Sequence, residues 1–111
     1  KKAELIEGIV YIGGAVGFCS DSQPHGSIIG WLGTYAAINP KLALGVEPTV
    51  RLDLDNQPQP DAVLLVTPEA GGQARLSDDD YIEEATELIV EIAASSVAIE
   101  YDLRKLRNEY T

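Results

Sequence analysis

The chain has 111 residues, of which 45% are hydrophobic and 23% charged, a composition typical of a globular protein with one domain. Eight basic residues against eighteen acidic ones give a formal net charge of −10, which opposes passive binding to a polyanion. No apolar run approaches the roughly 18 residues of a membrane span, and the start lacks the apolar segment of a secretory signal. Cys19 is the only cysteine, which excludes an intrachain disulfide and a thiolate zinc cluster. We therefore expect a cytoplasmic protein with a single domain over residues 1–111.

A hairpin and a helix are expected in the first third of the chain. Short β-type segments flank Glu7 and Gly8, and a glycine between β-branched residues predicts a turn. The glycine-rich segment 13–24 predicts a loop. Apolar residues then recur at helical spacing from Pro24 until an Asn-Pro pair stops the pattern, which predicts a helix over residues 24–38.

Strands are expected in the remainder. Apolar and charged residues alternate over residues 50–55, which predicts a strand with one exposed face. Residues 62–66 are apolar on both faces and predict a central strand. A loop with a solvated acidic end is expected over residues 68–80, and a third strand over 87–94. An apolar stripe over 97–110 predicts an amphipathic helix. This order predicts a mixed α/β or α+β domain.

Two acidic residues, Asp61 and Glu91, accompany the apolar strands. An ionised glutamate among apolar residues is costly unless it is paired, hydrogen-bonded or bound to a metal. If the two strands are neighbours, Asp61 and Glu91 converge at one end of the sheet. Two carboxylates suit Mg²⁺ or Mn²⁺. Such an ion polarises a phosphoryl oxygen and lowers the pKa of a bound water, as phosphodiester hydrolysis requires.

Simpler roles are available to both carboxylates. Asp61 follows a proline at the start of a strand and could be a solvated turn residue. Glu91 could form a structural ion pair with Arg51 or Arg75. On residue pattern alone, the metal site and the structural roles both stay open.

Five segments occur in an order that resembles one protein family. They are AELIEGIVY, PHGSIIGWL, VRLDLDNQPQPDAVLL, DDDYIEEATELIVEIAASS and YDLRKLRNEY. In these motifs, over about residues 3–110, the chain is similar to the Uma2 (Uma-two) family of restriction-endonuclease-like PD-(D/E)XK proteins. The resemblance implies an α/β (α+β) fold with a mixed central sheet flanked by helices. Family members continue into further strands, so the resemblance also implies a chain truncated at the C-terminus.

The resemblance implies roles for particular residues. The metal-binding aspartate and glutamate of the family fall on Asp61 and Glu91. The position expected for the family's lysine holds Leu106, and Lys105 comes one residue earlier, about 100° of helix rotation away. Either Lys105 reaches the site from a shifted helix, or the lysine role is lost, or the sequence lacks a residue; we favour Lys105. Four further residues are implied to lie near the site: Glu4, His25, Gln59 and Asp102.

Together with the resemblance, these residues predict an endonuclease that uses Mg²⁺ or Mn²⁺ to hydrolyse phosphodiester bonds, with DNA as the expected substrate. Asp61 and Glu91 would hold the ion, and Lys105 would offset charge on the scissile phosphate. The alternative is a catalytically degenerate, restriction-endonuclease-like interaction domain, which the net acidity and the displaced lysine favour. A homodimer is an expectation from the resemblance alone.

Overall fold

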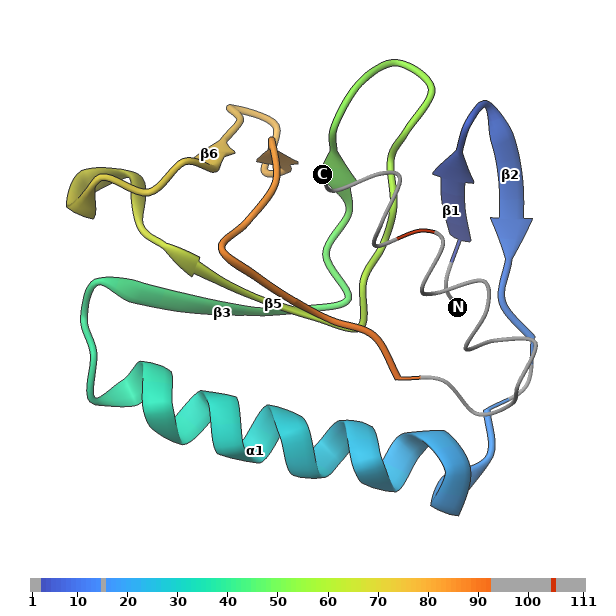
Figure 1. Cartoon of the computed structure of the whole chain (residues 1–111), viewed down its shortest axis with the longest axis horizontal. Helices are drawn as coiled ribbons and strands as arrows, with labels where there is room; N and C mark the ends of the chain where they lie inside the picture. The colour runs from blue at the N-terminus through green and yellow to red at the C-terminus, as the bar shows by residue number, and fades with distance from the viewer. Residues whose placement is uncertain (1–2, 15, 93–104, 106–111) are drawn as a thin grey trace.

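The computed structural model describes residues 3–14, 16–92 and 105 (Figure 1). The chain has a mixed α+β fold, and the described residues form one long helix and three small sheets. No helix within these ranges is long and apolar enough to cross a membrane. In chain order the elements are β1 (Ala3–Ile6), β2 (Ile9–Ile12), η1 (Phe18–Ser22), α1 (Gln23–Ala37), β3 (Leu42–Val46), β4 (Val50–Arg51), β5 (Ala62–Val66), η2 (Pro68–Ala70), β6 (Arg75–Leu76), β7 (Ile82–Glu83) and β8 (Leu88–Val90).

The predicted hairpin is confirmed. Strands β1 and β2 pair antiparallel with Ile6 opposite Ile9, which leaves Glu7 and Gly8 as a two-residue loop. Both loop residues have positive φ angles, 50° for Glu7 and 78° for Gly8. Positive φ at both central positions is the requirement of the hairpin turn whose twist matches its strands. The turn is tied to a second loop, because the Glu7 amide donates to Oδ1 of Asn56 at 2.8 Å.

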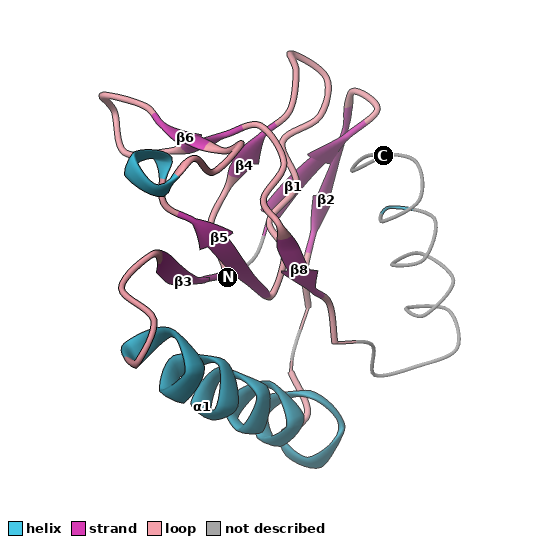
Figure 2. Cartoon of the chain, turned by 60° about the vertical axis from the view of Figure 1, so that its left-hand side comes forward, coloured by secondary structure: helices cyan, strands magenta, loops and turns pink. Residues whose placement is uncertain are grey.

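The largest sheet has the order β3–β5–β8, with both pairs antiparallel, so the prediction that residues 62–66 form a central strand is confirmed. Helix α1 covers one face of this sheet, below it in Figure 2. Its observed bounds agree with the predicted helix to within one residue at each end. Within the helix, the side chain of Leu32 is buried, whereas Trp31 keeps 71% of its surface exposed.

The opposite face of β5 packs on the second three-stranded sheet, β4–β7–β6, which lies above it in Figure 2. Because successive side chains of a strand point to opposite faces, β5 serves both layers. Its odd-numbered residues enter the core cluster and Leu64 faces the helix side. The buried members of that core are Val50, Val63, Leu65, Ala74 and Ile82.

Between residues 42 and 80 the structure differs from the prediction at three places. The strand β3 was not predicted, and the strand predicted over 50–55 is reduced to the two residues of β4. The carboxylate of Asp53 accepts hydrogen bonds from the Asp55 amide and the Asn56 side chain, which folds a tight turn that ends β4. Leu54 is consequently 92% exposed. The predicted loop over 68–80 contains η2 and β6, although its acidic residues are exposed as expected.

The predicted strand over 87–94 is observed as the three residues of β8, and residues 93 and 94 lie outside the described part. The helix predicted over 97–110 also lies outside it, except for Lys105, which is helical.

Candidate functional site

Asp61 and Glu91 lie opposite each other at one end of the main sheet. Strand β5 pairs antiparallel with β8, with Ala62 opposite Val90, and one further step in this register places Asp61 opposite Glu91. Oδ2 of Asp61 accepts a hydrogen bond of 2.6 Å from the amide of Ile92. By strand alternation both acidic residues lie on the face of the sheet directed away from α1.

The backbone of Asp61 is fixed by contacts from α1 and from the residue that follows β3. Its carbonyl oxygen lies 3.0 Å from Nε2 of His25 in α1, and it accepts a hydrogen bond of 3.0 Å from the Glu47 amide. Pro58 and Pro60, just before it, are fully buried. Asp61 itself is only 8% exposed, so the interpretation of it as a solvated turn residue is wrong.

Lys105 connects two acidic residues that are distant in sequence. Its Nζ lies 2.7 Å from Oε1 of Glu4 in β1 and 2.7 Å from Oε1 of Glu91 after β8. All three side chains are buried, with exposed fractions of 1% for Lys105, 7% for Glu4 and 3% for Glu91. A buried ion pair requires close geometry and further hydrogen bonds to offset its desolvation. Here the Lys105 ammonium forms ion pairs with both carboxylates.

Gln59 fixes Glu4 in place. Its backbone amide donates to Oε1 of Glu4 at 2.8 Å. Its side-chain oxygen accepts from the Ala3 amide at 3.1 Å, and its side-chain nitrogen donates to the Glu47 carbonyl at 2.9 Å. Glu4, Gln59 and His25, all expected near the site, therefore contact its residues directly, whereas Asp102 lies outside the described residues.

The alternative that Glu91 forms an ion pair with Arg51 or Arg75 is wrong. Arg51 binds Asp79 and Glu83, at 2.7 Å and 3.2 Å. Arg75 lies 3.5 Å from Glu84. Both arginines therefore form ion pairs away from the end of the sheet where Glu91 lies.

A comparison with models of protein families shows to which family this chain belongs. The Uma2 family model, described as "Putative restriction endonuclease", matches residues 1–111. The chain belongs to the Uma2 family. A search of curated proteins found no match. Uma2 membership confirms the resemblance seen in the motifs, and it indicates a nuclease-like function.

The polar cluster of this Uma2 chain has the donor chemistry of a hard-cation site. Glu4, Asp61, Glu91 and Lys105 provide three carboxylates against one ammonium, an excess of negative charge. Within the described ranges, no group of three or more His, Cys, Asp or Glu side chains is close enough to hold a metal ion. Mg²⁺ is usually held by one or two carboxylates, with water and substrate oxygens completing its shell. The pair Asp61 and Glu91 fits that pattern.

The residue pattern alone missed the contact between Glu4 and Lys105. Glu4 came only from the Uma2 resemblance, although β1 alternates and its second and fourth residues are buried. A carboxylate on the buried face of a strand needs a partner. The segment AELI contains such a carboxylate, but a strand of 4 residues is too short to show from sequence which of its faces is buried.

Proposed function

We propose that this Uma2 protein is a metal-dependent endonuclease that hydrolyses phosphodiester bonds of DNA. Asp61 and Glu91 would hold Mg²⁺ or Mn²⁺. The observation that supports this best is the position of Lys105, whose ammonium lies 2.7 Å from Glu91 and so beside the paired ends of β5 and β8. A cation next to two carboxylates is the combination that phosphoryl transfer uses to balance developing charge.

The chain's own residues prepare the site before substrate arrives. Glu4 and Glu91 hold Nζ of Lys105 from two sides, so the ammonium is oriented without loss of side-chain freedom during the reaction. The Asp61 carboxylate is held in place by its hydrogen bond from the Ile92 amide and by the contact between the Asp61 carbonyl oxygen and His25. A bound divalent ion supplies Lewis-acid activation of the phosphate and a more acidic water.

The test is cleavage of supercoiled plasmid and of duplex oligonucleotides with Mg²⁺ or Mn²⁺ added. We expect Asp61→Asn and Glu91→Gln each to lower the rate at least 100-fold, because each removes one ligand charge while keeping side-chain volume. Glu69→Gln, an exposed glutamate in η2, is the matched control and should cleave like the parent. Calorimetric titration with Mn²⁺ should show binding to the parent and much weaker binding to both site variants. Cleavage that survives both substitutions would falsify the assignment.

A second candidate is an interaction domain that has lost catalysis. The formal net charge of −10 favours it, because this charge disfavours contact with nucleic acid. A folded parent protein that binds no Mn²⁺ and cleaves no DNA would favour this alternative.

A further inference from the structure

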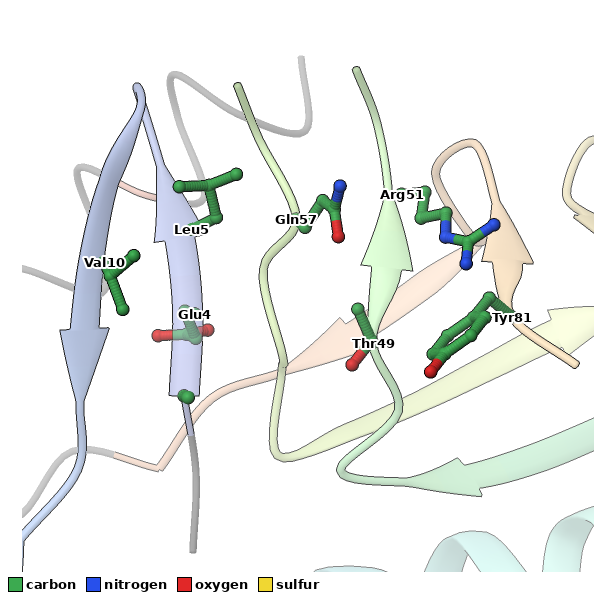
Figure 3. A pocket seen from close by; sticks show the side chains of 8 residues that line it. Glu4, Leu5, Val10, Thr49, Arg51, Gln57 and Tyr81 are labelled. Atoms are coloured by element: carbon green, nitrogen blue, oxygen red, sulfur yellow. The ribbon is translucent and has the colours of Figure 1, made fainter. Parts of the chain in front are cut away.

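An open pocket adjoins the candidate site. It encloses about 340 Å³ between the β1–β2 hairpin and β4. Glu4, Leu5 and Val10 line it from the hairpin, on the left of Figure 3. Because Glu4 also binds Lys105, the pocket and the lysine share one carboxylate. The pocket therefore lies next to the candidate site.

The charges of the pocket disfavour a phosphate group as the occupant. Arg51 lines the pocket, but its guanidinium makes two hydrogen bonds to Asp79, of 2.7 Å and 3.2 Å. A third bond of 3.2 Å goes to Glu83. Two carboxylates thus balance the one positive charge, and Glu4 adds a further negative one. An anion would gain little attraction here and would meet repulsion.

The remaining groups suit a flat, uncharged ring with polar edges. Tyr81 gives the pocket an aromatic surface, with the planar Arg51 guanidinium 4.1 Å from the centre of its ring (Figure 3). Thr49 and Gln57 also line the pocket, and their side chains make no hydrogen bond to any described part of the protein. Together they offer donors and acceptors of both kinds. A nucleobase combines a ring that stacks with an edge that donates and accepts.

We propose that this pocket binds one unpaired base of the nucleic acid, next to the phosphate at the candidate site. The inference rests on the proposed function for its substrate class. The base must be unpaired, because in a duplex its faces are stacked and its pairing edge is occupied. The volume lies at the lower end of the range for small-molecule sites, about 300–1,000 Å³, as a single base requires. The preferred substrate is therefore single-stranded DNA or a duplex with a flipped nucleotide.

The test measures binding of a labelled single-stranded oligonucleotide by fluorescence anisotropy at low salt, with EDTA present so that metal-dependent cleavage is blocked. We expect the blunt duplex of the same sequence to bind at least tenfold more weakly. Tyr81→Ala should weaken single-strand binding about tenfold, since stacking on an aromatic side chain contributes about 1–3 kcal/mol per base. Tyr81→Phe should keep the parent affinity. Tyr35→Ala, at an exposed tyrosine of α1, is the matched control.

An oligonucleotide of abasic units tests the same point on the unaltered protein, in case Tyr81→Ala unfolds. It keeps the phosphates and loses the bases, so we expect it to bind at least tenfold more weakly. Equal binding of the abasic and normal strands would overturn the proposal. An unchanged affinity of a folded Tyr81→Ala variant, or an absence of binding by the parent, would also overturn it.

The two proposals fail in different ways. Asp61→Asn and Glu91→Gln should lose cleavage while keeping Tyr81-dependent binding. Base-dependent binding by a parent that cleaves nothing would leave the pocket standing and reject the endonuclease. Metal-dependent cleavage that Tyr81→Ala does not change, and that is equally fast on single-stranded and duplex DNA, would support the endonuclease and reject the base pocket.

Discussion

Nζ of Lys105 lies 2.7 Å from Oε1 of Glu4, a residue 101 positions earlier in the chain, and both side chains are buried. Replacing Lys105 by Met leaves Glu4 and Glu91 buried without this cation. Loss of one partner of a buried ion pair typically costs about 3–5 kcal/mol. We therefore expect Lys105→Met to lower the free energy of unfolding by about that amount, measured by urea denaturation, and to abolish cleavage. Lys41→Met, at an exposed lysine, should change neither property.

A double-mutant cycle separates this contact from general disruption. Glu4→Gln keeps an oxygen that can accept the hydrogen bond from the Gln59 amide while removing the charge. Combined with Lys105→Met, it should cost less than the sum of the two single changes, because each has already removed the same ion pair. Strict additivity would contradict a direct interaction between Glu4 and Lys105.

His25 should contribute to the position of Asp61. Nε2 of His25 lies 3.0 Å from the Asp61 carbonyl, and His25→Ala removes this hydrogen bond. A hydrogen bond contributes about 1 kcal/mol on average, so we expect a fall in Tm of about 4 °C for a chain of this size. Cleavage should also slow, because Asp61 loses a constraint. Ser27→Ala, on an exposed position of α1, provides the control, and an equal Tm for the two variants would reject the role of His25.

Asp79 should make stability depend on pH in acid. Hydrogen bonds from Arg51 and Ser77 lower the pKa of the Asp79 carboxyl from 3.8 to about 2. Because the pKa is depressed in the folded state, the contribution to stability is present above pH 3.8 and is lost as the pH falls through about 2. Asp79→Asn should flatten the urea stability profile in that window. A pH dependence of the Asp79→Asn variant identical to that of the parent would refute this explanation.

The same substitution at two glycines should have opposite effects. Gly8 has a φ of 78° in the hairpin turn, so Gly8→Ala should destabilise the chain by about 1 kcal/mol or more. Gly26 lies in α1 with open space where a Cβ would project. Gly26→Ala should therefore stabilise by up to about 1 kcal/mol through helix propensity. Thermal unfolding of both variants, followed by circular dichroism, checks the signs, and a common sign would contradict the assigned backbone conformations.

The fold could be predicted where local chemistry and burial agree. The glycine turn, the apolar run of β5 and the proline-bounded helix each carry a strong local signal. Strand β3 does not, since its sequence LALGV has one β-branched residue and suits a helix nearly as well. The expected strand at 50–55 failed because Asp53 bonds its own backbone neighbours, and that competition ends the strand before Leu54 can be covered.

The candidate site, like the fold, could be predicted only in part from the sequence. Asp61 and Glu91 could be paired from sequence because both accompany apolar strands, and strand neighbours bring such positions together. The place of Lys105 could not be predicted, because one residue of helix register turns a side chain by about 100°. Only the folded structure shows that its ammonium reaches both Glu4 and Glu91.

The contact between Glu4 and Lys105 also has a consequence for synthesis of the protein. A ribosome delivers Lys105 about a hundred residues after Glu4. Closing so long a loop carries an entropic cost that only the folded intervening sheet can offset. Any activity that depends on the Lys105 ammonium therefore requires that residue 105 has been synthesised and that the intervening sheet has folded.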